Sequence, residues 1–124
     1  MIADLHVEYD YVVGSSKACA MPVCCRSDSG PAKDENDKAG IWGEYKCDMP
    51  ERTLSNMLAF IRDEIKPDVA FWGGDSVGHN LWSITKEGNI EILQKIGTQV
   101  LDGLAGMKTY IALGNHDSYP QDSF

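Results

Sequence analysis

The stretch "IALGNHD", residues 111–117, joins an apolar run to a glycine and then to three side chains that can bind metal ions or move protons. The same construction occurs in "VAFWGGD", residues 69–75, and in "MIADLH", residues 1–6. Each apolar run has the composition of a strand. If the strands are parallel, their carboxyl ends share one edge of a sheet, where ligands bind. The sequence therefore predicts that the three polar ends meet.

Two helices are predicted between these runs. Asp48, Pro50 and Glu51 form a helix-start pattern, with the acid as N-cap, the proline in the first turn and Glu51 at the capping-box position. The sequence Lys66-Pro67 would end this helix, and residues 86–104 form the second. The predicted apolar face of the first helix comprises Leu54, Leu58, Ile61 and Ile65. That of the second comprises Ile90, Leu93, Ile96, Val100, Leu101 and Leu104.

The resulting element order is β, long loop, α, β, α, β, which is typical of an α/β fold with a parallel sheet. The strands are expected at residues 1–5, 69–72 and 109–113. Residues 69–72 are apolar throughout, which predicts that both faces of the sheet are covered. A length of 124 residues corresponds to one domain or part of one.

A long polar insert, residues 14–48, separates the first strand from the first helix, and it contains all four cysteines. Residues 27–40 are too poor in apolar side chains to form anything but a loop. The cysteine spacing lacks the paired C-x2-C hooks of zinc knuckles. Disulfides are therefore favoured over zinc binding or free thiols, and they indicate an oxidising compartment.

Composition excludes several classes of function. The net charge of −8 argues against binding to a nucleic-acid polymer, which requires a basic surface, although a small phosphorylated substrate held by metal ions stays compatible. No apolar run approaches the length of a membrane span. The first residues show no signal-peptide pattern.

The polar strand ends have the chemistry of a metal site. Asp4 and His6 are two residues apart, so both side chains would point the same way from extended backbone. Carboxylate, imidazole and the amide oxygen of Asn115 suit zinc, manganese or iron. Each motif alone has a simpler interpretation, such as an acid closing a strand or a Gly-Asn turn. Three motifs at successive strand ends favour metal binding.

The motifs "DLH", "GGD" and "GNHD" resemble those of the calcineurin-like metallophosphoesterases, D-x-H, G-D and G-N-H-[DE]. Longer stretches resemble the acid sphingomyelinases and the acid-sphingomyelinase-like phosphodiesterases within that superfamily. These stretches are "CAMPVCCR" (19–26), "GIWGEYKCDMPERTL" (40–54), "GGDSVGHNLW" (73–82) and "GNHDSYPQDSF" (114–124). The resemblance covers essentially the whole chain. It implies a β-sandwich flanked by helices, of which only the first β-α-β-α-β portion is present.

The resemblance also implies the metal ligands. Asp4 and His6 would bind the first of two zinc ions, Asp75 would bridge both ions, and Asn115 would bind the second. Manganese or iron would fit the same ligands. Two neighbouring ions can hold the attacking and leaving oxygens of phosphoryl hydrolysis, so water rather than a serine is the expected nucleophile.

Two histidines receive catalytic roles from the resemblance. His79 and His116 would lie near the leaving group and donate a proton or stabilise charge. Many members of the wider superfamily carry a basic residue such as arginine after the bridging acid, where this chain has His79. Without the resemblance, His79 reads as a surface residue after a turn. Trp42, Tyr45 and Trp82 are expected to be packing residues rather than substrate contacts.

The resemblance implies disulfides Cys19–Cys24 and Cys25–Cys47, and a secreted or lysosomal protein. The implied reaction is hydrolysis of sphingomyelin to ceramide and phosphocholine, with peripheral contact to a membrane. The alternatives are a phosphodiesterase that cleaves nucleotides and a non-catalytic truncated product. Because the family's later histidine ligands are absent from residues 1–124, these residues alone are expected not to catalyse.

Overall fold

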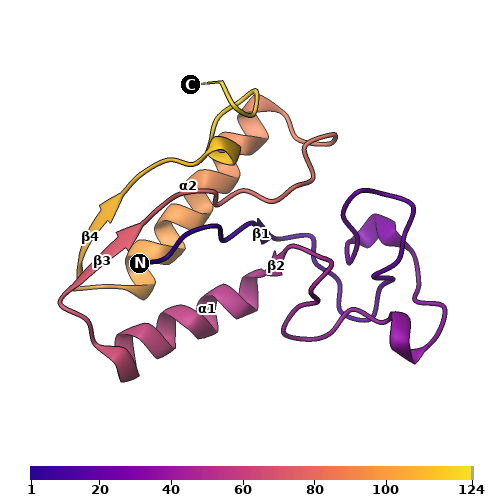
Figure 1. Ribbon diagram of the computed structural model, residues 1–124, viewed down its shortest axis with the longest axis horizontal. Helices are drawn as coiled ribbons and strands as arrows, with labels where there is room; N and C mark the ends of the chain where they lie inside the picture. Colours follow the sequence, from indigo (N-terminus) through magenta and orange to yellow (C-terminus); the bar gives the residue numbers. More distant parts are fainter. Residues whose placement is uncertain (124) are drawn as a thin grey trace.

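The computed structural model describes residues 1–123, and Phe124, the last residue of the stretch 114–124, lies outside the described residues. It is a small α/β structure with one polar lobe at its end (Figure 1). In chain order the strands and α-helices are β1 (Val7–Glu8), β2 (Met49–Pro50), α1 (Glu51–Phe60), β3 (Val69–Trp72), α2 (Lys86–Gly103) and β4 (Lys108–Ile111). A π-helical turn, Ile61–Ile65, extends α1, and single 3-10 turns occur at Ser27–Ser29, Glu35–Asp37 and Asn115–Asp117.

The strands form two parallel pairs, which confirms the predicted parallel arrangement. β1 pairs with β2, and β3 pairs with β4 from Val69 opposite Lys108 to Trp72 opposite Ile111. Two parallel bridges, Ile2 with Trp72 and Val7 with Val77, join the N-terminal segment up to β1 to β3 and to the loop after it. β2 was not predicted, because two residues are too few to produce a periodic signal. The second sheet of the expected sandwich stays a prediction.

The first strand differs from the prediction of residues 1–5. Only Ile2 forms a bridge there, and the regular strand is β1, two residues long. The reason is the backbone at Asp4 and His6, which have φ angles of 56° and 39° and so interrupt the ladder. The segment nevertheless follows the end of β3, because the Asp4 N–H donates to the Gly74 carbonyl over 3.1 Å.

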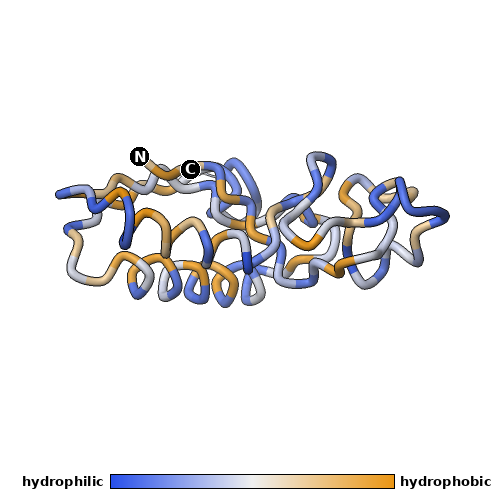
Figure 2. The backbone as a smooth tube through the Cα atoms, turned by 90° about the horizontal axis from the view of Figure 1, so that it is seen from below, coloured by the Kyte–Doolittle hydropathy of each residue, from blue (hydrophilic) through white to orange (hydrophobic). Residues whose placement is uncertain are grey.

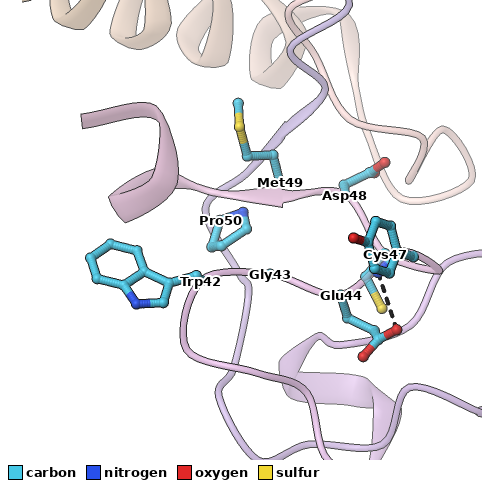
Figure 3. Close-up of a pocket in the computed structure, with 8 residues that line it drawn as sticks. Trp42, Gly43, Glu44, Cys47, Asp48, Met49 and Pro50 are labelled. Carbon is cyan, nitrogen blue, oxygen red and sulfur yellow. Dashed lines mark hydrogen bonds between the residues drawn. The ribbon is translucent and has the colours of Figure 1, made fainter. Parts of the chain in front are cut away.

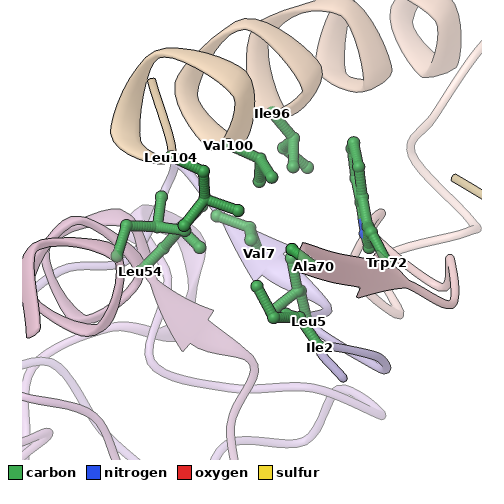
Figure 4. Close-up of a cluster of buried hydrophobic side chains, with 10 residues drawn as sticks. Ile2, Leu5, Val7, Leu54, Ala70, Trp72, Ile96, Val100 and Leu104 are labelled. Carbon is green, nitrogen blue, oxygen red and sulfur yellow. The ribbon is translucent and has the colours of Figure 1, made fainter. Parts of the chain in front are cut away.

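The hydrophobic core of the described residues lies where α1 and α2 pack against the strands (Figure 4). Hydrophobic and hydrophilic residues alternate along the coiled tube in Figure 2, as expected for helices with one buried side. The buried core residues are Ile2, Leu5, Val7, Leu54, Leu58, Ala70, Trp72, Ile96, Val100 and Leu104.

Four residues of the predicted helix faces lie outside this core, and one of them, Leu93, is partly buried. Ile65 is exposed because it is the last residue of the π-helical turn, whose wider spacing rotates the chain away from the α1 face. Ile90 and Leu101 are also exposed, since they lie at the edges of the apolar stripe of α2. The helix itself, predicted for 86–104, is confirmed at Lys86–Gly103.

The prediction that both faces of the sheet are covered is wrong for the described residues. Burial alternates along β3, with Ala70 and Trp72 buried and Val69 and Phe71 exposed. On the open face, the rings of Phe71 and Tyr110 stack with centroids 5.3 Å apart. Both described helices pack on the opposite, Trp72 side, so the apolar composition of β3 reflects one covered face only.

The predicted start of the first helix is also wrong. Pro50 is the N-cap and pairs in β2, so α1 begins at Glu51. Asp48 does not cap the helix, because its carboxylate accepts hydrogen bonds from His79 instead. The Glu51 side chain accepts from Ser55 and Gln99, which fixes α1 to α2 rather than closing a capping box.

The polar insert, residues 14–48, forms the lobe that extends away from the helices in Figure 1. It contains the two disulfides that the resemblance implies, Cys19–Cys24 and Cys25–Cys47. A buried ion pair between Glu8 and Arg26 ties the lobe to β1. Inside the lobe, the Lys33 N–H and then the Ser16 hydroxyl bond to Asp37 and lower the pKa of its carboxyl. The hydrogen bonds to the ionised Asp37 carboxylate stabilise the lobe at neutral pH. This stabilisation is lost as the pH falls through that lowered pKa.

We expect the two disulfides to stabilise the lobe unequally. On the chain-entropy account, closing the longer Cys25–Cys47 loop contributes about 3 kcal/mol, and the short Cys19–Cys24 loop contributes about 2 kcal/mol. Replacing Cys25 and Cys47 with serine should therefore speed proteolysis within residues 26–46 more than the matched Cys19/Cys24 replacement does. Time courses of peptide release at low protease concentration measure the difference. Equal rates for both variants would contradict it.

Candidate metal centre

The side chains at the three strand ends do meet. One ligand atom from each of Asp4, His6 and Asp75 lies within 4.8 Å of the others. His6 belongs to a second such group with His79 and His116, again within 4.8 Å. The five residues therefore form one continuous cluster around His6. Their convergence is what the parallel arrangement of the strand ends predicted.

The backbone that presents the acidic group is not extended. Asp4, His6 and Asp75 have φ angles of 56°, 39° and 52°, in the left-handed region that non-glycine residues rarely adopt. The expectation that Asp4 and His6 point together from an extended strand is therefore wrong, because the chain turns at each of them. Such conformations cost roughly 1–3 kcal/mol each and cluster at functional sites. Three in one cluster support a ligand-binding role.

The ring of His6 is oriented by the backbone of the neighbouring segment. Its Nδ1 lies 3.0 Å from the Val77 carbonyl oxygen, which can only accept a hydrogen bond. Nδ1 therefore carries the hydrogen, and Nε2 keeps the lone pair that a metal ion needs. This arrangement fits a metal ligand better than a core histidine bonded through both nitrogens.

Asp75 lies where two loops are in very close contact. Its Oδ1 accepts a hydrogen bond from the His116 N–H over 2.9 Å. A Cβ atom on Gly74 would lie 2.1 Å from the Gly114 nitrogen, so only glycine permits this approach. The glycines of "GGD" and "GNHD" therefore let the ends of β3 and β4 pack against each other.

Asp117 locks these two loops together, and sequence reasoning assigned it no role. Its carboxylate accepts the backbone N–H groups of Asp75, Ser76 and Gly114 over 2.9, 2.8 and 2.9 Å. The residue is only 6% exposed. Its place after the histidine in "GNHD" was the available signal, but the pattern does not say that the acid binds backbone rather than metal.

Asn115 and His116 lie in the single 3-10 turn that follows β4. The Asn115 carbonyl oxygen accepts hydrogen bonds from Ser118 and Asp122, which fixes the turn, and the role of its side chain as a ligand stays a prediction. His116 is 6% exposed, and its Nδ1 has no hydrogen-bond partner among residues 1–123. A buried imidazole nitrogen without a partner is consistent with a group that faces a ligand.

His79 lies beside the other two histidines, although its own side chain is 45% exposed. Its ring centroid is 4.1 Å from that of His6 and 4.6 Å from that of His116. The interpretation of His79 as a surface residue therefore agrees with its exposure, but it does not account for the two histidine rings beside it. The Asp48 carboxylate contacts His79 through both oxygens, at 2.7 Å from Nδ1 and 2.6 Å from the backbone nitrogen. Sequence reasoning missed this partner because it assigned Asp48 to the helix cap.

A cavity of about 720 Å³ opens beside the cluster, and Asp4, His6 and His79 line it. A neighbouring groove of about 610 Å³ runs along residues 42–50, with Trp42 at one end and Asp48 at the other (Figure 3). The expectation that Trp42, Tyr45 and Trp82 are packing residues is wrong, since all three are exposed. Tyr45 lines both hollows, so an apolar surface adjoins the polar cluster.

Comparisons with known proteins show relatives along almost the entire chain. It is 39% identical over 124 residues to sphingomyelin phosphodiesterase of Bos taurus and 36% identical over 126 residues to sphingomyelin phosphodiesterase B of Dictyostelium discoideum. Acid sphingomyelinase-like phosphodiesterase 3b of Homo sapiens is 33% identical over 125 residues. Each alignment covers 99% of this chain but only 20%, 20% and 26% of the relative. No family model matches the chain.

The chain thus spans about a fifth of the length of the sphingomyelin phosphodiesterases that it matches. Among the described residues, no helix is both long enough and apolar enough to cross a membrane.

Asp117→Asn should loosen the contact between the two loops. An amide offers one acceptor oxygen and places an N–H against a backbone N–H, at a cost of roughly 2 kcal/mol. The amides of residues 75, 76 and 114 should then exchange with solvent about thirtyfold faster. Hydrogen-exchange mass spectrometry measures this, with the exposed Asp122→Asn as the matched control. Unchanged protection in Asp117→Asn would contradict the locking role.

Proposed function

We propose that this protein is a metal-dependent phosphodiesterase that hydrolyses sphingomyelin to ceramide and phosphocholine. The observation that carries the proposal is the convergence of Asp4, His6, Asp75, His79 and His116 at one rim. Two relatives that align with 99% of this chain, at 39% and 36% identity, are named sphingomyelin phosphodiesterase and sphingomyelin phosphodiesterase B.

The proposed cofactor is a pair of zinc ions, and manganese or iron would suit the same ligands. Asp4 and His6 would hold the first ion, Asp75 would bridge both, and Asn115 would hold the second. When bound, the ions would supply an activated water and neutralise charge on the phosphoryl oxygens. The lone pair on Nε2 of His6 and the strained backbone of Asp4 and Asp75 support this assignment.

His79 and His116 are proposed to act on the leaving group. His79 is the more exposed of the two, lines the cavity, and can reach a substrate oxygen as a proton donor. His116 is buried, its backbone N–H donates to Asp75, and its ring is suited to stabilise negative charge on the departing oxygen. Proton donation matters most for an alkoxide such as that of ceramide, which leaves poorly when unprotonated.

The surroundings of the site support a lipid substrate and an extracytoplasmic location. The exposed Trp42 and Tyr45 border the groove beside the cluster and would contact a lipid or a membrane surface. Two disulfides support a secreted or lysosomal protein. The net charge of −8 opposes binding to nucleic-acid polymers, whereas a nucleotide diester stays the competing small substrate.

The test is an assay of the full-length gene product with zinc against sphingomyelin and against a dinucleotide. We expect release of phosphocholine and no comparable cleavage of the dinucleotide. Preferential cleavage of the dinucleotide would replace the lipid substrate with a nucleotide. An absence of metal-dependent cleavage of either substrate would overturn the proposed function.

Asp75→Asn in the full-length protein should reduce the bound metal from two ions towards one or none, because a neutral amide bridges two cations poorly. Metal analysis of the purified variant measures this directly. Asp102→Asn, which replaces an exposed acid on α2, is the matched control and should keep the wild-type metal content. Retention of two ions in Asp75→Asn would count against the bridge.

His79→Ala should slow cleavage of a phosphocholine ester of an alcohol by about 100-fold or more, within the usual contribution of a general acid. Cleavage of p-nitrophenyl phosphocholine should change little, because p-nitrophenolate leaves without a proton. Initial rates on the two esters, which share one headgroup, give the comparison. Equal losses on both would show that His79 only positions the site.

A further inference from the structure

We propose that Asp48 is a positioning residue for the reaction, one that holds His79 in the orientation and tautomer required for proton donation. This inference rests on the proposed function, in which His79 protonates the leaving oxygen. Nothing in the motif resemblance gives Asp48 a role, and the sequence pattern around it indicated a helix cap.

The contact engages both oxygens of one carboxylate. Asp48 Oδ2 accepts the backbone N–H of His79 over 2.6 Å, and Oδ1 lies 2.7 Å from Nδ1 of the same residue. The first bond fixes the backbone of His79, and the second fixes its ring. A carboxylate that only balanced charge on an exposed histidine would not need to bind its backbone as well.

Asp48 itself is held firmly. It is 8% exposed, although the His79 side chain that it contacts is 45% exposed. The next residue, Met49, donates its N–H to the His6 carbonyl oxygen over 3.0 Å, and the preceding residue, Cys47, is bonded to Cys25. Asp48 therefore lies at a fixed point between the insert and the cluster.

Gly78 leaves the space that this contact requires. A Cβ atom at residue 78 would lie 2.8 Å from Asp48 Oδ2, closer than real side-chain contacts. The segment from Asp75 to His79 thus approaches the Asp48 carboxylate closely enough for two hydrogen bonds. This approach is a second, independent feature that favours the pair.

The consequence for chemistry follows from the two ring nitrogens. Because a carboxylate oxygen accepts, Nδ1 of His79 carries a hydrogen and Nε2 is the nitrogen that exchanges a proton with the substrate. In the step, a water oxygen bonds to phosphorus and releases one proton to solvent, the bond from phosphorus to the ceramide oxygen breaks, and the proton on Nε2 moves to that oxygen. The Asp48 carboxylate holds the ring in the orientation that points Nε2 at the leaving oxygen, as acids that orient catalytic histidines do elsewhere.

The experiment measures Asp48→Asn, His79→Ala and the double variant in the full-length gene product with zinc. Each is assayed on p-nitrophenyl phosphocholine and on short-chain sphingomyelin, which share a headgroup and differ in leaving group. We expect Asp48→Asn to slow sphingomyelin cleavage by about tenfold to 100-fold through kcat, with less than about a threefold change on the nitrophenyl ester. The double variant should be no slower than His79→Ala alone, because the two residues act as one unit.

Asp37→Asn is the matched control, since it removes another buried carboxylate of the insert that does not contact the cluster. It should leave the ratio of the two rates unchanged. The role of Asp48 would be overturned if Asp48→Asn lost equal activity on both esters, or if the losses multiplied in the double variant. In either case, an active wild type would still uphold the proposed function. A wild type inactive on both esters would overturn the proposed function and this role with it.

Discussion

The candidate site depends on one buried carboxylate that binds backbone rather than metal. Asp117 accepts three N–H groups from the two loops that follow β3 and β4. Parallel strands bring their ends to one edge, but they do not set how closely the following loops pack. The Asp117 carboxylate sets that distance, and Asn89 of α2 donates to the Asp117 carbonyl oxygen, so a core helix is attached to the same residue. The candidate metal ligands are therefore held in place by a polar network that is itself buried.

This network explains why strained backbone persists at the candidate ligands. Asp4, His6 and Asp75 each adopt a left-handed conformation that an isolated chain would avoid. Their N–H and carbonyl groups are engaged across the loops, as in the bond from the His6 N–H to the Asp75 carbonyl oxygen. Those bonds offset the cost of the left-handed backbone conformations. As a result, the side chains converge on a common point.

The sequence predicted what depends on local pattern and on strand order. The parallel arrangement, the helix at 86–104 and the meeting of the polar ends all follow from periodicity and from motifs such as "IALGNHD". The paired cysteines followed from the resemblance. What escaped prediction depends on contacts between distant residues: β2 exists only because Met49 meets Val7, and Asp48 meets a histidine 31 residues away. An acid before Met-Pro-Glu is a good helix cap by propensity, and tertiary contact overrode that preference.

The insert is consequently part of the candidate site rather than an appendage to it. Its last residues run from Cys47, which is bonded to Cys25, through Asp48, which holds His79, to Met49, which bonds to the backbone of His6. Three successive residues thus connect the cysteine framework to both histidines on that side of the cluster. A free polar loop of this length would have no defined position, because it buries too little apolar surface to order itself. The cross-links and the buried pair of Glu8 with Arg26 give it one, which lets a loop carry a residue whose position matters to chemistry.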